Sequence, residues 1–376
     1  MKHLTIGGST ISRTIACPSW SKDLPELKKP ASGAANLGNL LHDAMENYYQ
    51  KGQSFKSQIG ELKFADLVLD NEHLPILEKA LVQTELILDL YDIAEFICEP
   101  FVEYIPGEAG GSIDLLGVSH DGKTVLILDY KFGRIPVSAE NNAQLQFYAL
   151  CAKTDKKTSS FFADATNYVG VIVQPYVSSE PDEYLFYGDE LDYFTTEVDL
   201  AISLTKNPHP PTLAGEHCSY CPKNAICDTR RDYAQTAYLL DSKDRNKLAA
   251  SLPLAIELKS WCEEVIETAR YASDKGIKIP GFKRVAGKNL RVWEDQTKAA
   301  IQLESDLAEN AYIKKMLTPP QAIKALELRD LLTDKYEDLI TFKQSKPLVV
   351  KNSDKREEIN TEIKNENLQI FLANKK

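Results

Sequence analysis

Three charged residues end two short apolar stretches of the chain. Asp114 follows GGSI, and Asp129 and Lys131 close the stretch LILDYK with one residue between them. Because side chains of a strand alternate between its two faces, Asp129 and Lys131 share a face. Carboxylates hold Mg²⁺, which activates water and neutralises charge on a phosphodiester, while a nearby lysine orients the water and stabilises the transition state. The pattern indicates metal-dependent phosphodiester hydrolysis, unless Asp-Tyr-Lys only marks a strand that meets solvent.

Side chains on the neighbouring predicted elements extend this set. Glu99 lies on the strand predicted before Asp114, where it is either a third carboxylate of the site or a solvated edge residue. Gln144 and Tyr148 lie four residues apart on the next predicted helix and therefore share a face. They either position Lys131 or a phosphate, or form a polar pair on a packed helix.

The periodicity of apolar residues predicts the elements that hold these side chains. Helical spacing and β-rich runs follow one another in the order helix, three strands, helix, strand, and the three consecutive strands are expected to form a meander. The segments are helices over 36–50 and 74–94, strands over 95–105, 112–118 and 124–130, a helix over 140–152 and a strand over 168–174. Beyond them, 231–275 and 297–345 are predicted to be helical and 277–294 to be a β-hairpin.

In this order the motifs resemble those of the RecB-like branch of the PD-(D/E)xK nuclease superfamily. Asp114 matches the first aspartate of that branch. Asp129-x-Lys131 matches its (D/E)xK element, and Gln144 with Tyr148 matches its QxxxY helix. The resemblance implies an α/β fold with a restriction-endonuclease-like core, in which helices flank a mixed central sheet, followed here by a helical C-terminal extension. It also implies that these matching residues are catalytic.

The predicted helix over 36–50 carries a further match. Gly38-x3-His42-x3-Glu46 resembles the histidine motif of the branch, in which the histidine is an additional metal ligand. Taken alone, a histidine on a helix is more often structural, and Glu46 lies on the same helix face, where it would orient the imidazole. The ligands that the resemblance implies for a Mg²⁺ or Mn²⁺ ion are His42, Glu99, Asp114 and Asp129.

Longer segments resemble a phage and prophage family catalogued only as a domain of unknown function. They are GGSIDLLGV, ILDYKFGRIPVSAENNAQLQFYALCA, VIVQP, GEHCSYC, IPGFKRVAGKNLRVW and SDKR. This likeness runs over nearly the whole chain. Arg134 and Ile135 replace the Lys-Gly pair usual in that loop, which leaves the implied metal ligands unchanged.

Four of the seven cysteines form an asymmetric pattern. Cys218, Cys221 and Cys227 are clustered, whereas Cys17 lies near the N-terminus. The arrangement differs from the paired C-x2-C knuckles of structural zinc sites and suits a 4Fe–4S cluster, which needs four cysteine ligands. It also resembles the iron–sulfur members of the RecB-like nucleases, where the cluster brackets the nuclease core. Structural Zn²⁺ held by all four cysteines, or by three of them with His217, and free thiols are the alternatives.

The composition excludes several classes of protein. The 376 residues include 44 Lys plus Arg and 55 Asp plus Glu, a net charge of -11, and 43% are hydrophobic. Such a composition is typical of a globular protein rather than a disordered chain or a fibre. No apolar run approaches the roughly 18 residues of a membrane span, and the start lacks a signal-peptide core. We therefore expect no membrane association and a cytoplasmic location, in the host cell if the protein is phage-encoded.

The charge is unevenly distributed along the chain. Residues 80–122 and 158–205 each contain nine acidic residues and no lysine or arginine, so the remainder is positive. Within that remainder, the predicted hairpin interleaves basic residues with Phe282 and Trp293. This is typical of a surface that contacts a nucleic-acid backbone and stacks on bases, the alternative being a solvated hairpin with two core aromatics. The candidate DNA-binding residues are Lys283, Arg284, Lys288 and Arg291.

These features together predict a domain organisation and a function. We expect a nuclease core over 1–230 that the four-cysteine cluster closes, a helical extension over 231–350 and a charged, flexible tail over 351–376. The motifs predict a Mg²⁺- or Mn²⁺-dependent deoxyribonuclease, an exonuclease that acts on linear DNA ends in phage recombination or replication. Its expected partners are DNA, a phage single-strand annealing protein and further copies of itself. The alternative is a noncatalytic iron–sulfur protein that binds DNA or assists assembly and retains the nuclease fold.

Overall fold

The computed structural model describes most of the chain. The described residues are 4–24, 32–238, 245–287, 289–313, 315–327, 329, 331, 336, 339–344, 348–351, 357 and 359. The chain divides into two compact units, Met1–Cys262 and Glu263–Lys376. The boundary lies further along the chain than the predicted end of the nuclease core at residue 230.

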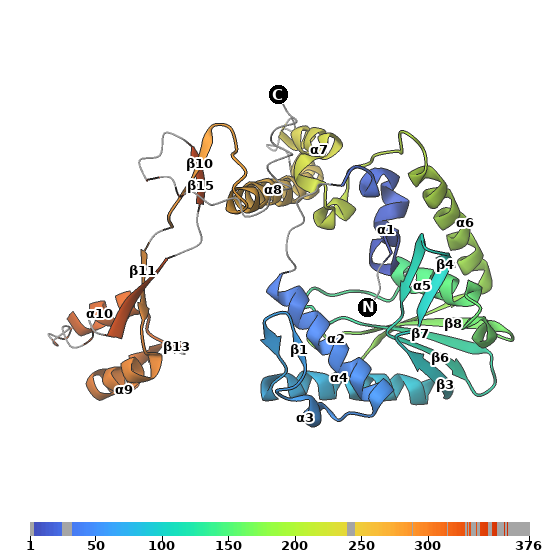
Figure 1. Cartoon of the computed structure of the whole chain (residues 1–376), viewed down its shortest axis with the longest axis horizontal. Helices are drawn as coiled ribbons and strands as arrows, with labels where there is room; N and C mark the ends of the chain where they lie inside the picture. The colour runs from blue at the N-terminus through green and yellow to red at the C-terminus, as the bar shows by residue number, and fades with distance from the viewer. Residues whose placement is uncertain are drawn as a thin grey trace. The chain divides into compact units, whose positions relative to one another are not determined.

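A five-stranded mixed sheet forms the centre of the first unit (Figure 1). Its strands lie in the order β3, β6, β7, β8, β9, with β7 and β8 parallel and the other neighbours antiparallel. The bounds are β3 (Ile93–Cys98), β6 (Leu115–Ser119), β7 (Thr124–Tyr130), β8 (Asn167–Val173) and β9 (Asp182–Tyr187). Two antiparallel pairs accompany the sheet, β1 (Lys63–Phe64) with β2 (Leu67–Val68) and β4 (Phe101–Ile105) with β5 (Ala109–Ser112).

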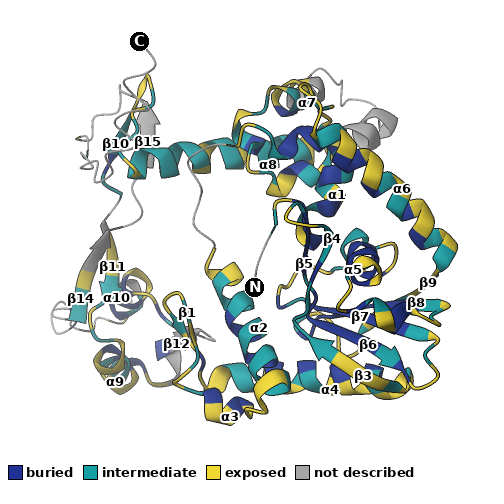
Figure 2. Cartoon of the chain, turned by 45° about the vertical axis from the view of Figure 1, so that its right-hand side comes forward, coloured by how far each residue is buried: buried dark blue, intermediate teal, exposed yellow. Residues whose placement is uncertain are grey.

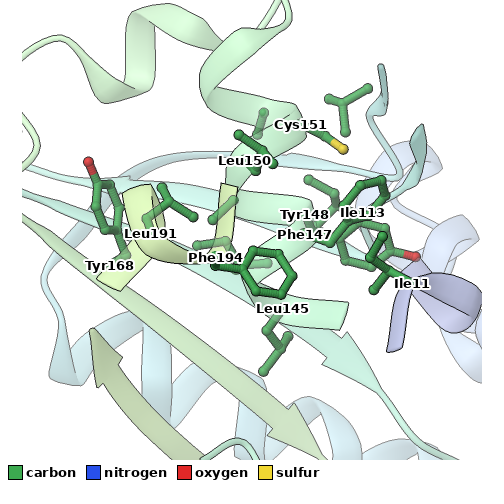
Figure 3. Packing of buried hydrophobic residues seen from close by; sticks show 14 of the residues in the cluster. Ile11, Ile113, Leu145, Phe147, Tyr148, Leu150, Cys151, Tyr168, Leu191 and Phe194 are labelled. Carbon is green, nitrogen blue, oxygen red and sulfur yellow. The ribbon is translucent and has the colours of Figure 1, made fainter. Parts of the chain in front are cut away.

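Helices pack on both faces of this sheet. Val125 and Ile127 of β7 belong to a core with α1, α5 and α6, whereas Leu126 and Leu128 belong to a core with α2 and α4. β7 and β8 are consequently covered on both faces, and nearly all of their residues are buried (Figure 2), which explains their nearly continuous apolar sequences. Figure 3 shows the first of these cores. The helices are α1 (Gly8–Ala16), α2 (Gly33–Lys51), α4 (Leu74–Leu90), α5 (Ala143–Thr154) and α6 (Gly188–Thr205).

Shorter helices connect these elements and extend the first unit. They are η1 (Pro18–Ser21), α3 (Phe55–Gln58), η2 (Asn71–His73), η3 (Ser159–Phe162), η4 (Glu216–Tyr220), η5 (Asn224–Ile226) and α7 (Asp228–Tyr238). The long helix α8 (Arg245–Asp274) follows and contains the boundary between the two units. None of the helices in the described part of the chain combines the length and apolar character required to cross a membrane.

The structure confirms the mixed α/β architecture with a mixed central sheet flanked by helices. The strand predicted over 124–130 coincides with β7. The single strand predicted over 95–105 is wrong, because the chain turns at Glu99, whose φ is 52°, and at Pro100. As a result β3 stays in the central sheet, and β4 leaves it to pair with β5.

The second unit differs from the sequence prediction in its strand pairing. β10 pairs with β15 and β11 with β14, so the hairpin predicted over 277–294 is wrong. The helical prediction over 297–345 holds for α9 and α10 but misses three strands. The tail predicted over 351–376 falls almost entirely outside the described residues. The bounds are β10 (Phe282–Val285), β11 (Asn289–Trp293), α9 (Gln296–Leu307), η6 (Ala308–Ala311), β12 (Tyr312–Ile313), β13 (Lys315–Met316), α10 (Pro319–Glu327), β14 (Ile340–Gln344) and β15 (Leu348–Lys351).

Candidate active site

Three predicted ligand residues from different segments come together at one end of the central sheet. His42 extends from α2, Glu99 lies between β3 and β4, and Asp114 lies between β5 and β6. One ligand atom of each side chain lies within 4.8 Å of the other two. His42 Nδ1 is 3.5 Å from Asp114 Oδ2, and it is buried without a hydrogen-bond partner. The structure therefore places two carboxylates and an imidazole around one point.

Local backbone geometry aims the Glu99 carboxylate at this point. Glu99 adopts a left-handed backbone conformation, which costs a residue other than glycine of order 1–3 kcal/mol. Its N–H donates to the backbone oxygen of Asp114 over 3.1 Å. The Asp114 side chain in turn accepts a hydrogen bond from the backbone N–H of Tyr130. These contacts fix both carboxylates relative to β7.

Asp129, Lys131 and Gln144 form a hydrogen-bonded network beside the three ligands. Lys131 Nζ lies 2.7 Å from Asp129 Oδ2 and donates to Gln144 Oε1 over 2.9 Å. Gln144 Nε2 donates to Asp129 Oδ1 over 2.6 Å and lies 3.4 Å from Tyr148 Oη. Gln144 therefore bridges the lysine and the carboxylate, in agreement with the positioning role considered for it. Asp129 lies outside the ligand group, because both of its oxygens face Lys131 and Gln144, and its role as a ligand stays a prediction.

Burial and mutual repulsion perturb the titration of these groups. Burial, with the Asp114 and Glu46 carboxylates, raises the pKa of Glu99 from 4.5 to about 9. Burial also raises the pKa of Asp129, which Lys131 offsets only in part. For His42, burial disfavours the protonated ring, but the Asp114 and Asp129 carboxylates together outweigh this effect and raise the pKa. Several buried carboxylates thus lie close together, and the cationic groups beside them do not fully offset their repulsion.

The donor set fits a hard divalent cation. Carboxylate oxygens and one imidazole suit Mg²⁺ or Mn²⁺, and a cation at this point would relieve the repulsion that raises the pKa of Glu99. The buried, unpartnered Nδ1 of His42 is the kind of atom that a bound ion would satisfy. The residues present therefore fit a divalent metal ion, whose identity stays a prediction.

Two aromatic residues that were not predicted from the sequence pack around His42. The imidazole packs edge-on against Tyr130 and Phe132, with ring centroids 6.1 and 5.2 Å away. Tyr130 Oη is 3.0 Å from Thr84 Oγ1 of α4, which fixes the ring. The sequence contains a signal for these two rings, because both residues flank Lys131. Side chains alternate along an extended chain, so the two rings lie on the face opposite the lysine.

The segment with the clustered cysteines contacts the N-terminal segment that contains Cys17. Arg13 Nε donates to the backbone oxygen of His217 over 3.4 Å, and Lys223 Nζ donates to that of Ser19 over 2.7 Å. Burial raises the pKa of both Cys218 and Cys221, and the Cys17 thiol adds to each shift. Cys17, Cys218 and Cys221 therefore share one neighbourhood.

The cysteine sulfurs do not surround a single point in the described part of the chain. No three of them lie within 4.8 Å of one another, and all seven cysteines are free of disulfides. A tetrahedral Zn²⁺ with Zn–S distances of about 2.3 Å would require closer sulfurs. The predicted cluster and its zinc alternatives with or without His217 stay predictions.

The predicted DNA-binding residues lie in the second unit. Lys283 and Arg284 are on β10 and Arg291 is on β11, whereas Lys288 lies outside the described residues. Arg284 pairs with Asp274 over 3.2 Å. Trp293 packs beside Tyr336, and its indole N–H donates to the backbone oxygen of Leu317, so this ring belongs to the core of the unit. Of the two predicted aromatics, only Phe282 is exposed.

Comparison with known proteins assigns the chain to a family. Residues 3–357 match DUF2800, described as a protein of unknown function, and the chain belongs to this family. This confirms the expected likeness to a family catalogued as a domain of unknown function. Among solved structures, "Crystal structure of SSO0001" aligns with 58% of this chain and 94% of that chain at 12% identity. Its TM-score of 0.22 is too low to establish a shared fold.

Proposed function

We propose that this protein is a Mg²⁺- or Mn²⁺-dependent deoxyribonuclease with a PD-(D/E)xK core of the RecB-like type. The observation that carries the proposal is the Asp129–Lys131–Gln144 network, which lies directly beside the group formed by His42, Glu99 and Asp114. The pKa shifts of His42 and Asp129 support the proposal, because they show that His42, Asp114 and Asp129 interact electrostatically.

In the proposed mechanism, His42, Glu99 and Asp114 would hold the cation, with Asp129 as an expected further ligand. Mg²⁺ or Mn²⁺, when bound, supplies an activated water and neutralises charge on the phosphodiester. Lys131 orients the attacking water through its ammonium group and stabilises the negative charge that develops in the transition state. Gln144 keeps that ammonium in place, and the Tyr130 and Phe132 rings hold the imidazole and exclude water from its apolar side.

The proposed substrate is the end of linear DNA, with recombination or replication of phage DNA as the setting. The resemblance to RecB-like nucleases favours an exonuclease over an endonuclease. DNA, a single-strand annealing protein and further copies of the chain are the proposed partners, and Lys283 and Arg291 are proposed to contact DNA. An inactive protein with an intact metal cluster would instead support the noncatalytic DNA-binding or assembly role.

End-labelled double- and single-stranded DNA incubated with Mg²⁺ or Mn²⁺ tests the proposal. We expect the wild type to degrade at least one substrate, and Asp129→Ala and Lys131→Ala to be inactive. Lys123→Ala is the matched control, since Lys123 lies exposed just before the other end of β7. A wild type that is inert on every substrate would contradict the proposal.

We also propose a structural 4Fe–4S cluster held by Cys17, Cys218, Cys221 and Cys227. The contacts of Arg13 and Lys223 support it, because they already tie the two cysteine-bearing segments together. Anaerobic purification followed by iron and zinc analysis tests this proposal. A colourless protein with one bound zinc would favour the zinc alternative.

A further inference from the structure

A pocket with a mixed polar and apolar lining lies on the side of α5 that faces away from the catalytic network. Its volume is about 530 Å³, and its walls come from α1, the start of α5 and the first turns of α6. Gln144 and Gln146 are two residues apart on α5, so their side chains diverge by roughly 200° around the helix. The polar lining residues are Ser12, Asn141, Gln146, Asp189, Glu190, Tyr193 and Glu197.

The side chain of Gln146 is the unusual feature of this pocket. It is 9% exposed, and its carboxamide makes no hydrogen bond within the described part of the chain. Carboxamides this buried are normally paired within the protein, whereas the polar atoms of Gln146 keep their access to solvent only through the pocket. The neighbouring side chains of α5, among them Leu145 and Phe147, are packed in the apolar core (Figure 3). Gln146 therefore brings a polar group with no internal partner to the pocket.

The walls of the pocket present hydrogen-bond acceptors and negative charge. Glu190 is already engaged, since its carboxylate accepts from Tyr187 N–H over 3.2 Å and from Tyr184 Oη over 3.1 Å. Asp189 and Glu197 have no such partner among the described residues. Because 158–205 contains no lysine or arginine, no cationic side chain of α6 neutralises them, although the N-terminus of α6 stabilises the Asp189 carboxylate. This charge disfavours an anionic ligand such as a DNA phosphate and favours a cation with N–H donors.

The spacing of these groups distinguishes an organic cation from a metal ion. In the described residues, no three carboxylate, histidine or cysteine ligands of this pocket lie within 4.8 Å of one another, as a compact divalent ion would require. A guanidinium group is planar and carries five N–H donors, so it can reach separated carboxylates and an amide oxygen together. The exposed ring of Tyr193 at the pocket offers a surface on which a guanidinium stacks.

The surface of α6 beside the pocket indicates a protein as the source of this cation. Tyr193 is 69% exposed and Leu200, seven residues later on the same helix face, is 61% exposed. Arginine and tyrosine dominate the energetics of protein interfaces, and exposed apolar side chains around an anchor pocket exclude water. We propose that this pocket receives an arginine side chain from a basic segment of a partner protein, with Gln146, Asp189 and Glu197 as its hydrogen-bond acceptors.

A labelled peptide tests this proposal independently of nuclease activity. The probe is a fluorescein-labelled hexapeptide with one arginine between aliphatic residues, titrated with the full-length protein and followed by anisotropy. The same peptide with citrulline, which keeps the shape and loses the charge, is the control ligand. We expect the arginine peptide to bind at least tenfold more tightly than the citrulline peptide. Equal affinities, or no binding at millimolar protein, would overturn the proposal.

Variants of the protein locate the binding site. Gln146→Leu and Glu197→Gln are each expected to weaken peptide binding at least fivefold. Asp192→Asn removes the same charge from α6 outside the pocket lining and should change the affinity less than twofold. If Asp192→Asn and Glu197→Gln weaken binding equally, the attraction is unspecific and the proposal fails. Tighter binding of free arginine amide than of the peptide would assign the pocket to a small molecule and overturn the role of a partner protein.

A thermal melt separates binding from folding. Because the carboxamide of Gln146 makes no hydrogen bond to the described residues, we expect Gln146→Leu to preserve or raise the melting temperature while it weakens peptide binding. Loss of both stability and binding would mean that Gln146 is structural. In that case Glu197→Gln alone decides, and unchanged peptide binding by this variant would refute the proposal.

Discussion

Replacement of Gln144 by alanine tests how the lysine is held in the candidate active site. The carboxamide makes one hydrogen bond to Lys131 of 2.9 Å and one to Asp129 of 2.6 Å. Hydrogen bonds to charged groups contribute about 1.5–3 kcal/mol each. If the loss of one such bond in the transition state misplaces the ammonium, the rate of cleavage falls roughly 10- to 100-fold. Gln144→Ala should therefore be slow but not inactive.

Single-turnover cleavage of end-labelled DNA with saturating Mn²⁺ measures this loss. We expect the effect in kcat rather than in KM, because Gln144 contacts Lys131 and Asp129 and none of the three residues grouped around the cation position, His42, Glu99 and Asp114. Gln144→Glu should be at least as slow, since it places a carboxylate where the amide now donates to Asp129. Gln146→Leu, on the other side of α5, is the matched control and should cleave at the wild-type rate. A Gln144→Ala enzyme within threefold of wild type would refute the positioning role.

Three further predictions concern the metal, the pH and the cysteines. Mn²⁺ at about 100 times its Kd should stabilise the wild type by roughly 2.7 kcal/mol in thermal melts. His42→Ala should abolish this stabilisation. An equal stabilisation of the wild type and of His42→Ala would refute His42 as a ligand. The pKa of Glu99 is about 9 in the folded protein and 4.5 ordinarily. Between these values the metal-free folded protein keeps a proton that the unfolded chain releases. The free energy of unfolding should therefore fall as the pH rises from 5 to 9. Melts of Glu99→Gln in EDTA should show a weaker fall, and an unchanged slope would argue against this assignment. Cys17→Ser should lose the iron of the anaerobically purified protein, whereas Cys262→Ser, at an exposed position, should retain it.

The local sequence pattern predicted the central elements because the apolar positions of each element are the positions that it buries. The apolar residues of β7 occupy both faces of the sheet, which is why 124–130 was recognisable as a strand. The helical spacing over 36–50 likewise predicted α2, whose Leu40, Leu41 and Met45 are buried. The resemblance of the motifs to the RecB-like branch then implied that His42 and Asp114 belong to one site, and the structure brings these two side chains together.

Other features depend on contacts that local pattern does not encode. The turn at Glu99 breaks a run that reads as one strand, yet this turn is what directs the carboxylate to Asp114. The pairing of β10 with β15 and of β11 with β14 joins segments distant in the chain, so neighbouring strands looked like a hairpin. The bridging hydrogen bonds of Gln144 depend on distances between β7 and α5, which spacing along one helix cannot supply.

Cleavage of end-labelled DNA by wild type, Lys131→Ala and Lys123→Ala, in Mn²⁺ and in EDTA, tests the central proposal most directly. The account predicts metal-dependent degradation by the wild type and by Lys123→Ala. It predicts a loss of at least 100-fold in Lys131→Ala, in keeping with the roughly 10²- to 10³-fold effect of removing one transition-state donor. Degradation that persists in EDTA, or that proceeds equally in Lys131→Ala, would contradict it.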